Sequence, residues 1–205
     1  AIFAYAHENS AIIVADRKRT DSTGTLPIAD VAKVRRWREY IPFAATGPSR
    51  TMDRIGSRLA NIEENSTYSL SAKGMIQAVR DAIAWVRQDL EDAGKPASFV
   101  SAMMQGTVVA AFPAIFEDDA IILKISIETG NCERLLSTVA CAGSDPGSFL
   151  TIAVTELVRQ SSSVNFELDI WAAHCIKNAQ IICPTHVGGT FNVSFTRFDG
   201  KDSFI

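Results

Sequence analysis

Hydrophobic residues at the start of the chain form two short runs, Ile2 to Ala6 and Ala11 to Ala15, with His7-Glu8-Asn9-Ser10 between them. Short apolar runs joined by a polar turn predict a β-hairpin. The end of a chain is normally frayed unless other contacts hold it in place. A hairpin that starts at residue 1 therefore raises the question of why this chain orders its first residue, an alanine.

Later segments alternate between strand and helix patterns. We expect strands at Val31 to Trp37 and Ile41 to Thr46, because both are apolar or alternating runs. Apolar residues then recur at helical spacing from Met52 to Ile62. A second helix is expected from about Ser71 to Ala93, with an apolar stripe at Met75, Val79, Ile83, Val86 and Leu90.

The second half of the chain repeats this order of strands followed by helices. Strands are expected at Phe99 to Phe112, Ala120 to Ile127 and Leu135 to Cys141, helices at about Ser148 to Gln160 and Phe166 to Ala179, and a last strand at Thr190 to Arg197. Blocks of strands and blocks of helices do not fit the regular βαβ alternation of a parallel sheet. The pattern predicts an α+β protein with two antiparallel sheets and helices on their outer faces, in one domain of residues 1–205.

Composition narrows the class of protein without naming a function. Hydrophobic residues make up 47% and charged residues 21% of the chain, which is ordinary for a globular protein. The net charge of −3 predicts no nucleic-acid partner. No apolar run approaches the roughly 18 residues of a membrane span, and no secretion signal is recognisable. We therefore expect a cytoplasmic protein that does not bind membranes.

The four cysteines, Cys132, Cys141, Cys175 and Cys183, form no CxxC pair, and no histidine stands at metal-ligand spacing from two of them. The pattern favours buried, reduced thiols. It predicts neither a metal site nor a cofactor.

Five short segments, spread over almost the whole chain, carry a family resemblance. They are Ala15-Asp16-Arg17-Lys18-Arg19-Thr20, Ala32-Lys33-Val34, Ala44-Ala45-Thr46-Gly47, Val139-Ala140-Cys141-Ala142-Gly143-Ser144, and Gly188-Gly189 with the strand and turn up to Gly200. Together with a hairpin at residue 1, they resemble the proteasome β-subunit family of N-terminal-nucleophile (Ntn) hydrolases. The resemblance implies a four-layer αββα sandwich.

The resemblance also implies a site at the N terminus. In that family residue 1 is a threonine whose hydroxyl attacks the scissile carbonyl and whose α-amino group helps to take the proton. By resemblance, Asp16 is the acid, Lys33 the lysine and Gly47 the backbone donor to the oxyanion, while Ser144 can hydrogen-bond the terminal amine. Without the resemblance, Asp16 and Lys33 read as a plain ion pair between adjacent strands.

Several positions depart from the family pattern. Ala1 has no hydroxyl, and Asp16 lies one residue closer to the terminus than the family's acid usually does. Pro184 and Val187 stand where the family usually has an aspartate and a serine before the glycine pair. Thr185 and His186 either compensate for them or lie in an exposed turn.

Three interpretations remain open. The first is a threonine-type peptidase that is inactive with this sequence, because its nucleophile has been changed to alanine or is missing. Such a peptidase would act on peptides or proteins, form a ring-like homo-oligomer and work with an ATP-dependent unfoldase. The second is a natural pseudoenzyme, a structural or interaction subunit whose Met-Ala start has been trimmed. The third, an Ntn amidohydrolase acting on a small amide, is disfavoured because it also requires Ser, Thr or Cys at residue 1.

Overall fold

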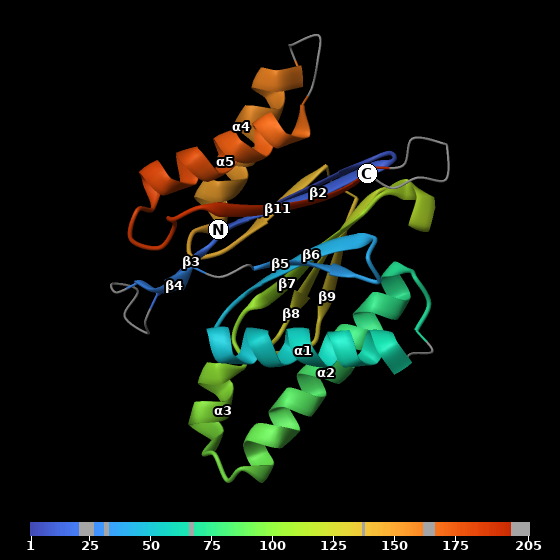
Figure 1. Ribbon diagram of the computed structural model, residues 1–205, viewed down its shortest axis with the longest axis vertical. Helices are drawn as coiled ribbons and strands as arrows, with labels where there is room; N and C mark the ends of the chain where they lie inside the picture. Colours follow the sequence, from blue (N-terminus) through green and yellow to red (C-terminus); the bar gives the residue numbers. More distant parts are fainter. Residues whose placement is uncertain (21–26, 31–32, 66–67, 137, 162–166, 198–205) are drawn as a thin grey trace.

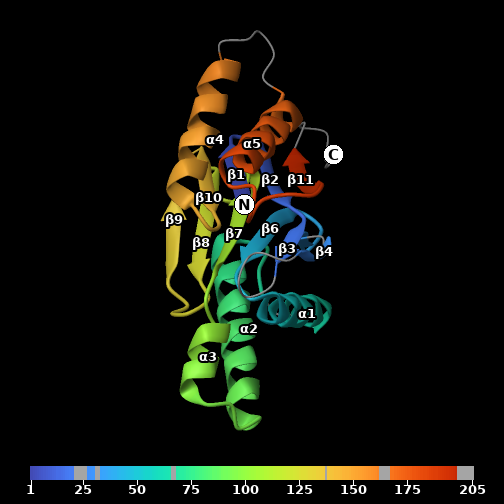
Figure 2. The same ribbon diagram turned by 90° about the vertical axis from the view of Figure 1, so that its left-hand side faces the viewer.

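The fold consists of two stacked β-sheets with helices on both outer faces (Figure 1). It is seen in a computed structural model that describes residues 1–20, 27–30, 33–65, 68–136, 138–161 and 167–197. The order of layers is helices, sheet, sheet, helices, as Figure 2 also shows. The predicted αββα sandwich is therefore confirmed.

The first sheet has four strands in the order β10-β1-β2-β11, and all neighbours are antiparallel. Their bounds are β1 (Ile2–His7), β2 (Ser10–Asp16), β10 (Val139–Ala142) and β11 (Phe191–Arg197). The predicted hairpin at the N terminus is confirmed, with Ile2 opposite Ala15 in its register. On the other side of β2, Phe191 lies opposite Asp16, so β11 reaches the same end of the sheet as the chain start.

The second sheet has five antiparallel strands in sequential order, β5-β6-β7-β8-β9. Their bounds are β5 (Val34–Trp37), β6 (Ile41–Thr46), β7 (Thr107–Phe112), β8 (Ile121–Ser126) and β9 (Cys132–Leu135). A small ribbon of β3 (Lys18–Thr20) and β4 (Pro27–Asp30) continues from β2. The hydrophobic pattern did not predict this ribbon, because its strands are too short to show a period.

Helices α1 (Ser49–Asn65) and α2 (Ala72–Asp92) pack on the five-stranded sheet, and the short α3 (Ala97–Met103) packs on α2. Helices α4 (Pro146–Ser161) and α5 (Leu168–Ile182) pack on the four-stranded sheet. A single 3-10 turn, η1 (Ala114–Phe116), follows β7. Ser71 caps α2, since its Oγ accepts a hydrogen bond from the Gly74 N–H at 3.1 Å. None of the helices in the described ranges is long and apolar enough to cross a membrane.

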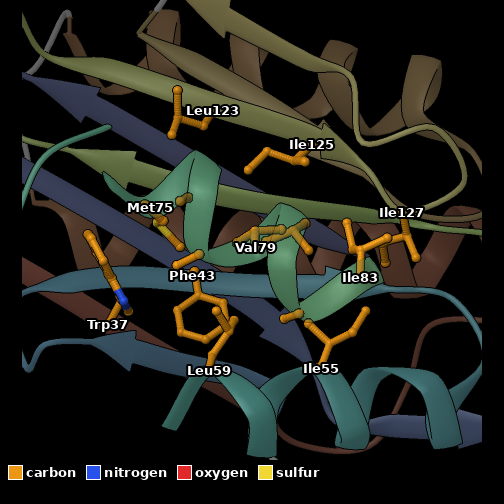
Figure 3. Close-up of a cluster of buried hydrophobic side chains, with 14 of the residues drawn as sticks. Trp37, Phe43, Ile55, Leu59, Met75, Val79, Ile83, Leu123, Ile125 and Ile127 are labelled. Carbon is orange, nitrogen blue, oxygen red and sulfur yellow. The ribbon is translucent and has the colours of Figure 1, made fainter. Parts of the chain in front are cut away.

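The core has three apolar layers that follow from strand alternation. Phe3 and Tyr5 of β1 point toward α4 and α5, whereas Ile2, Ala4 and Ala6 point toward the second sheet. The layer between the sheets is rich in alanine, and small side chains let the two sheets lie close together. The third layer holds the α2 stripe against Phe43, Ile55 and Leu59 (Figure 3).

Two predicted strands are wrong in part. The run from Phe99 to Phe112 begins as helix α3 and becomes strand only at Thr107. Val100 and Met104, four residues apart, are both buried, as the helical turn brings them to the same side. The run from Leu135 to Cys141 is the end of β9 and the start of β10, and Leu136 between them is 74% exposed.

Candidate active site

The chain start lies at one end of β1, at the position marked N in Figure 1. The antiparallel pairing with β2 sets the place of Ala1, because Asp16 is the next residue after the partner of Ile2. The Asp16 N–H donates to the carbonyl of Ala1 at 3.3 Å. The α-amino group and the Asp16 side chain are thereby brought to the same end of the hairpin.

The Asp16 carboxylate is the centre of the site. Its Oδ1 accepts a hydrogen bond from the α-amino group of Ala1 at 2.5 Å. Its Oδ2 accepts from Lys33 Nζ and from the backbone N–H of Lys18, both at 3.1 Å. Asp16 is fully buried, and a buried carboxylate is costly unless donors of this kind surround it.

The Asp16–Lys33 pair joins the two sheets. Asp16 ends β2 in the four-stranded sheet, while Lys33 immediately precedes β5 in the five-stranded sheet. The pair therefore does not connect neighbouring strands of one sheet, because β2 and β5 belong to different sheets. Asn192 of β11 supports the lysine segment, since its Oδ1 accepts from the Lys33 N–H at 3.3 Å.

Burial lowers the pKa of the Ala1 α-amino group below its ordinary value near 8. The Asp16 carboxylate acts in the opposite direction and raises this pKa, whereas the Lys33 ammonium lowers it further. An amine with a lowered pKa exists to a larger extent as the neutral base at neutral pH. The site therefore combines an α-amino group of lowered pKa, a buried carboxylate and the Lys33 side chain.

Gly47 lies in the turn between β6 and α1 and packs tightly on its neighbours. Its φ of +132° is unfavourable for other residues, and a Cβ built on it would come within 2.3 Å of the Gln105 carbonyl. Gly106 faces it in the same way, with a φ of +130° and a Cβ position 2.0 Å from the Thr46 carbonyl. Two glycines thus hold the strand ends of β6 and β7 together at this point.

Ser144 lies in the turn after β10, next to the chain start. A Cβ on its neighbour Gly143 would lie 3.2 Å from the Ala1 Cα, which shows how closely this turn approaches. Ser144 is exposed and its Oγ lies 3.8 Å from Cys183 Sγ. Among the described residues, the hydrogen bond of the terminal amine goes to Asp16 and not to Ser144.

The turn at residues 184–187 is exposed at Thr185 and His186, whose side chains hydrogen-bond each other at 2.8 Å. Lys18 Nζ holds this turn by donating to the carbonyls of Pro184 and Thr185 at 2.9 and 2.7 Å. Of the two readings of Thr185 and His186, the exposed turn matches the structure. The contacts of Lys18 and Asn192 in the site were not predicted from the sequence. The features that could have indicated them are the charged run after β2 for Lys18 and the polar residue inside β11 for Asn192.

Residue 1 as a whole is partly buried. The side chains of Ala1 and Asp16 have no exposed surface, whereas 23% of the Lys33 side chain is exposed. All four cysteines are free thiols. Cys141 and Cys175 are buried as expected, but Cys132 and Cys183 are only half-buried, so for these two the expected burial is wrong. The described ranges contain no group of three side chains suited to hold a metal.

Comparisons with known proteins identify solved structures with a similar architecture. No protein-family model and no curated protein matches this sequence. Among solved structures, HslV from Trypanosoma brucei is 14% identical with a TM-score of 0.62, covering 96% of this chain and 99% of its own. BPH from Thiobacillus denitrificans, solved in complex with epoxomicin, is 12% identical with a TM-score of 0.67, covering 96% and 97%. Anbu (ancestral beta-subunit) from Yersinia bercovieri is 12% identical with a TM-score of 0.68, covering 95% and 80%.

TM-scores of 0.62–0.68 over nearly the whole chain establish a shared fold, and identities of 12–14% establish nothing finer. HslV and Anbu have the proteasome-like Ntn architecture that the sequence resemblance implied. The chain accordingly has the proteasome β-subunit-like fold of the Ntn hydrolases.

Proposed function

We propose that this protein is a proteasome-like Ntn peptidase, with residues 1–205 as a single domain, in which Ala1 occupies the nucleophile position. The observation that carries the proposal is the buried cluster of α-amino group, Asp16 carboxylate and Lys33 ammonium. With alanine at residue 1 the chain has every charged member of this cluster and no nucleophile. A protein with this sequence is therefore expected not to hydrolyse peptides.

Each group of the site has a proposed role. The neutral α-amino group serves as the base, and Asp16 holds it in place through the 2.5 Å hydrogen bond. Lys33 keeps the site positive and lowers the pKa of the amine. Gly47 supplies the backbone N–H for the oxyanion, and Ser144 completes the rim of the site.

A complete reaction for amide hydrolysis can be written when residue 1 carries a hydroxyl group. The hydroxyl oxygen attacks the scissile carbonyl carbon, and its proton passes to the α-amino group. The C–N bond then breaks, the proton goes to the leaving amine, and an ester to residue 1 remains. Water hydrolyses this ester and releases the second product.

The test is a pair of isosteric substitutions, Ala1→Thr and Ala1→Val. Both add the same volume at residue 1, but only threonine supplies a hydroxyl. We expect Ala1→Thr to hydrolyse fluorogenic peptides, while the parent chain, Ala1→Val and the double variant Ala1→Thr/Lys33→Ala do not. Intact mass must confirm a free residue 1 in each preparation. Hydrolysis by the parent chain, or equal activity of the threonine and valine variants, would contradict the proposal.

A second candidate is a subunit without catalysis that serves an assembly. The observation that favours it is the packing of the Ala1 side chain against the core between the four-stranded sheet and its helices, so that the side chain itself does not face solvent. Pro184 and Val187, in place of the family's aspartate and serine, point the same way. This candidate predicts that Ala1→Thr folds normally and remains inactive, because the side chain of residue 1 faces the core and not a substrate.

Assembly is common to both candidates. We propose a ring-like homo-oligomer, supported by the exposed apolar side chains Leu150, Val154 and Val158, which recur every four residues on α4. Proteins or peptides are the proposed substrates, and an ATP-dependent unfoldase is the proposed partner. A cytoplasmic location is supported by four free cysteines. Light scattering after size exclusion tests the assembly, and a monomer of 22.2 kDa would contradict it.

A further inference from the structure

A cavity of about 640 Å³ lies among helices α1, α2 and α3, on the outer side of the five-stranded sheet. These helices lie below that sheet in Figure 1, whereas the N-terminal site lies on the other side of it. The volume is within the range of small-molecule sites, roughly 300–1,000 Å³. Its lining is mostly apolar and includes Val86, Leu90 and Met103.

An aromatic ring and two guanidinium groups form one wall of the cavity. Trp85 of α2 is 41% exposed, although tryptophan is a costly side chain to leave in water. Arg54 and Arg58, one turn apart on α1, lie over its ring with Cζ at 5.5 and 5.3 Å from the centroid. Stacking on the ring fixes the direction of both guanidinium groups.

The two arginines differ in their partners. Arg54 forms an ion pair with Asp89, so its charge is compensated. Arg58 Nε is buried and, among the described residues, has no hydrogen-bond partner. A buried donor without an acceptor is rare in native proteins and calls for a physical reason. Because this atom has almost no exposed surface, an acceptor brought by a ligand reaches it only when the Arg58 side chain shifts on binding.

The remaining charges make the cavity cationic. Arg50, one turn before Arg54, and Lys95, whose Nζ lies 5.8 Å from the Phe99 ring centroid, also line it. The two lining acids have partners already, since Asp89 pairs with Arg54 and Asp53 with Arg35. No ion pair found between described residues involves Arg50, Arg58 or Lys95. This excess of positive charge contrasts with the net charge of −3 of the whole chain.

We propose that the cavity binds a small-molecule carboxylate with an apolar body. The carboxylate accepts hydrogen bonds from Arg58, and the apolar body lies against Trp85 and Phe99. One carboxylate matches the fork of one guanidinium group. A polyanion such as a phosphate ester fits less well, because Arg54 is already paired with Asp89 and the apolar part of the lining cannot replace the hydration of several charged oxygens.

The cavity contains its own reporter. Trp37 and Trp171 are 1% and 0% exposed, so Trp85 is the tryptophan whose fluorescence responds to a ligand in the cavity. The test titrates the full chain with 4-phenylbutyrate and with its uncharged analogue 4-phenylbutyramide, using fluorescence and calorimetry. We expect saturable binding of the acid and about tenfold weaker binding of the amide, because the amide loses the charge-assisted hydrogen bonds.

Substitutions assign the binding to the cavity. Arg58→Gln is expected to weaken binding of the acid about tenfold and to leave binding of the amide unchanged. Lys73→Gln is the matched control, since it removes one exposed positive charge from α2 outside the cavity and is expected to change nothing. If Arg58→Gln fails to fold, Arg58→Lys keeps the charge without the fork and still weakens binding of the acid. Equal affinity of acid and amide, unchanged affinity in the Arg58 variants, or no saturation in the millimolar range overturns the proposal.

Discussion

Asp16→Asn tests the physical account of the N-terminal cluster most directly. The substitution keeps the volume of the side chain but removes the charge that stabilises two cations, the α-ammonium group of Ala1 and Lys33. Removing one partner of a buried ion pair usually destabilises a protein by about 3–5 kcal/mol. Here the α-amino group can escape part of that cost by losing its proton.

Because the Ala1 α-amino group can lose its proton, the destabilisation by Asp16→Asn has an upper limit that depends on pH. The unfolded α-amino group has a pKa near 8, so making it neutral costs at most about 1.4 kcal/mol for each pH unit below 8. The upper limit is about 2.7 kcal/mol at pH 6, about 1.4 kcal/mol at pH 7, and close to zero at pH 8.5. The lost hydrogen bond to the partly exposed Lys33 adds about 1 kcal/mol at every pH.

The direction of the pH dependence follows from the folded-state pKa of the Ala1 amine in the parent protein and in the variant. Asp16 raises the pKa of the Ala1 amine, so this pKa is lower in the variant than in the parent protein, and both are lower than in the unfolded chain. The stabilisation by Asp16 is therefore fully present at low pH and is lost as the pH rises through the parent's folded-state pKa. The destabilisation caused by Asp16→Asn is expected to fall from at most about 3.7 kcal/mol at pH 6 to about 1 kcal/mol at pH 8.5.

Urea unfolding followed by circular dichroism at pH 6, 7 and 8.5 measures this difference in free energy of unfolding. Glu133→Gln is the control, because its ion pair with Lys124 is 3.9 Å long and 62% of the Glu133 side chain is exposed. That variant is expected to lose less than about 0.5 kcal/mol, with no trend over this pH range. A cost of Asp16→Asn that stays constant or grows from pH 6 to pH 8.5 would refute the account of the cluster.

Three further predictions concern the scaffold. In urea unfolding, Gly106→Ala is expected to lower the free energy of unfolding by at least about 3 kcal/mol, because its Cβ would overlap the Thr46 carbonyl. The control Gly94→Ala, with open space around it, is expected to cost only about 1 kcal/mol. Equal costs would contradict the close approach of β6 and β7. Alkylation by iodoacetamide at pH 8, followed by mass spectrometry, is expected to modify Cys132 and Cys183 first, because burial raises the pKa of Cys141 to about 12; early modification of Cys141 would contradict this order. Val158→Glu is expected to weaken or abolish the proposed homo-oligomer in light scattering, since 62% of Val158 is exposed on the α4 stripe, and an unchanged mass would show that α4 lies outside the interface.

Periodic segments of the sequence were sufficient to predict most of the fold. The α2 stripe from Met75 to Leu90 is buried as its spacing indicated, and the hairpin of β1 and β2 has the expected bounds within a residue or two. Prediction failed where an apolar run was short. Seven residues of α3 show too few turns to reveal a helical period, and the boundary between β9 and β10 is marked by a single exposed leucine.

The site was predictable only in part. Asp16 and Lys33 were expected together because a family resemblance aligned their segments, and the structure brings them to 3.1 Å. The contributions of Lys18 and Asn192 were not expected, because each depends on a contact between distant parts of the chain. Asn192 reaches Lys33 only because β11 pairs with β2, across more than 150 residues of sequence.

By itself, the sequence determined which residues could carry chemistry and which could not. Ala1 lacks a hydroxyl in any fold, the apolar periods require two layers of helices around sheets, and the number of charges fixes the overall balance of −3. Only the tertiary structure decided that Asp16 is fully buried between two cations, and that three arginines of α1 line a cavity beside Trp85. The physical reason is that burial and pairing depend on which distant segments meet, and the pKa of the Ala1 amine depends on both.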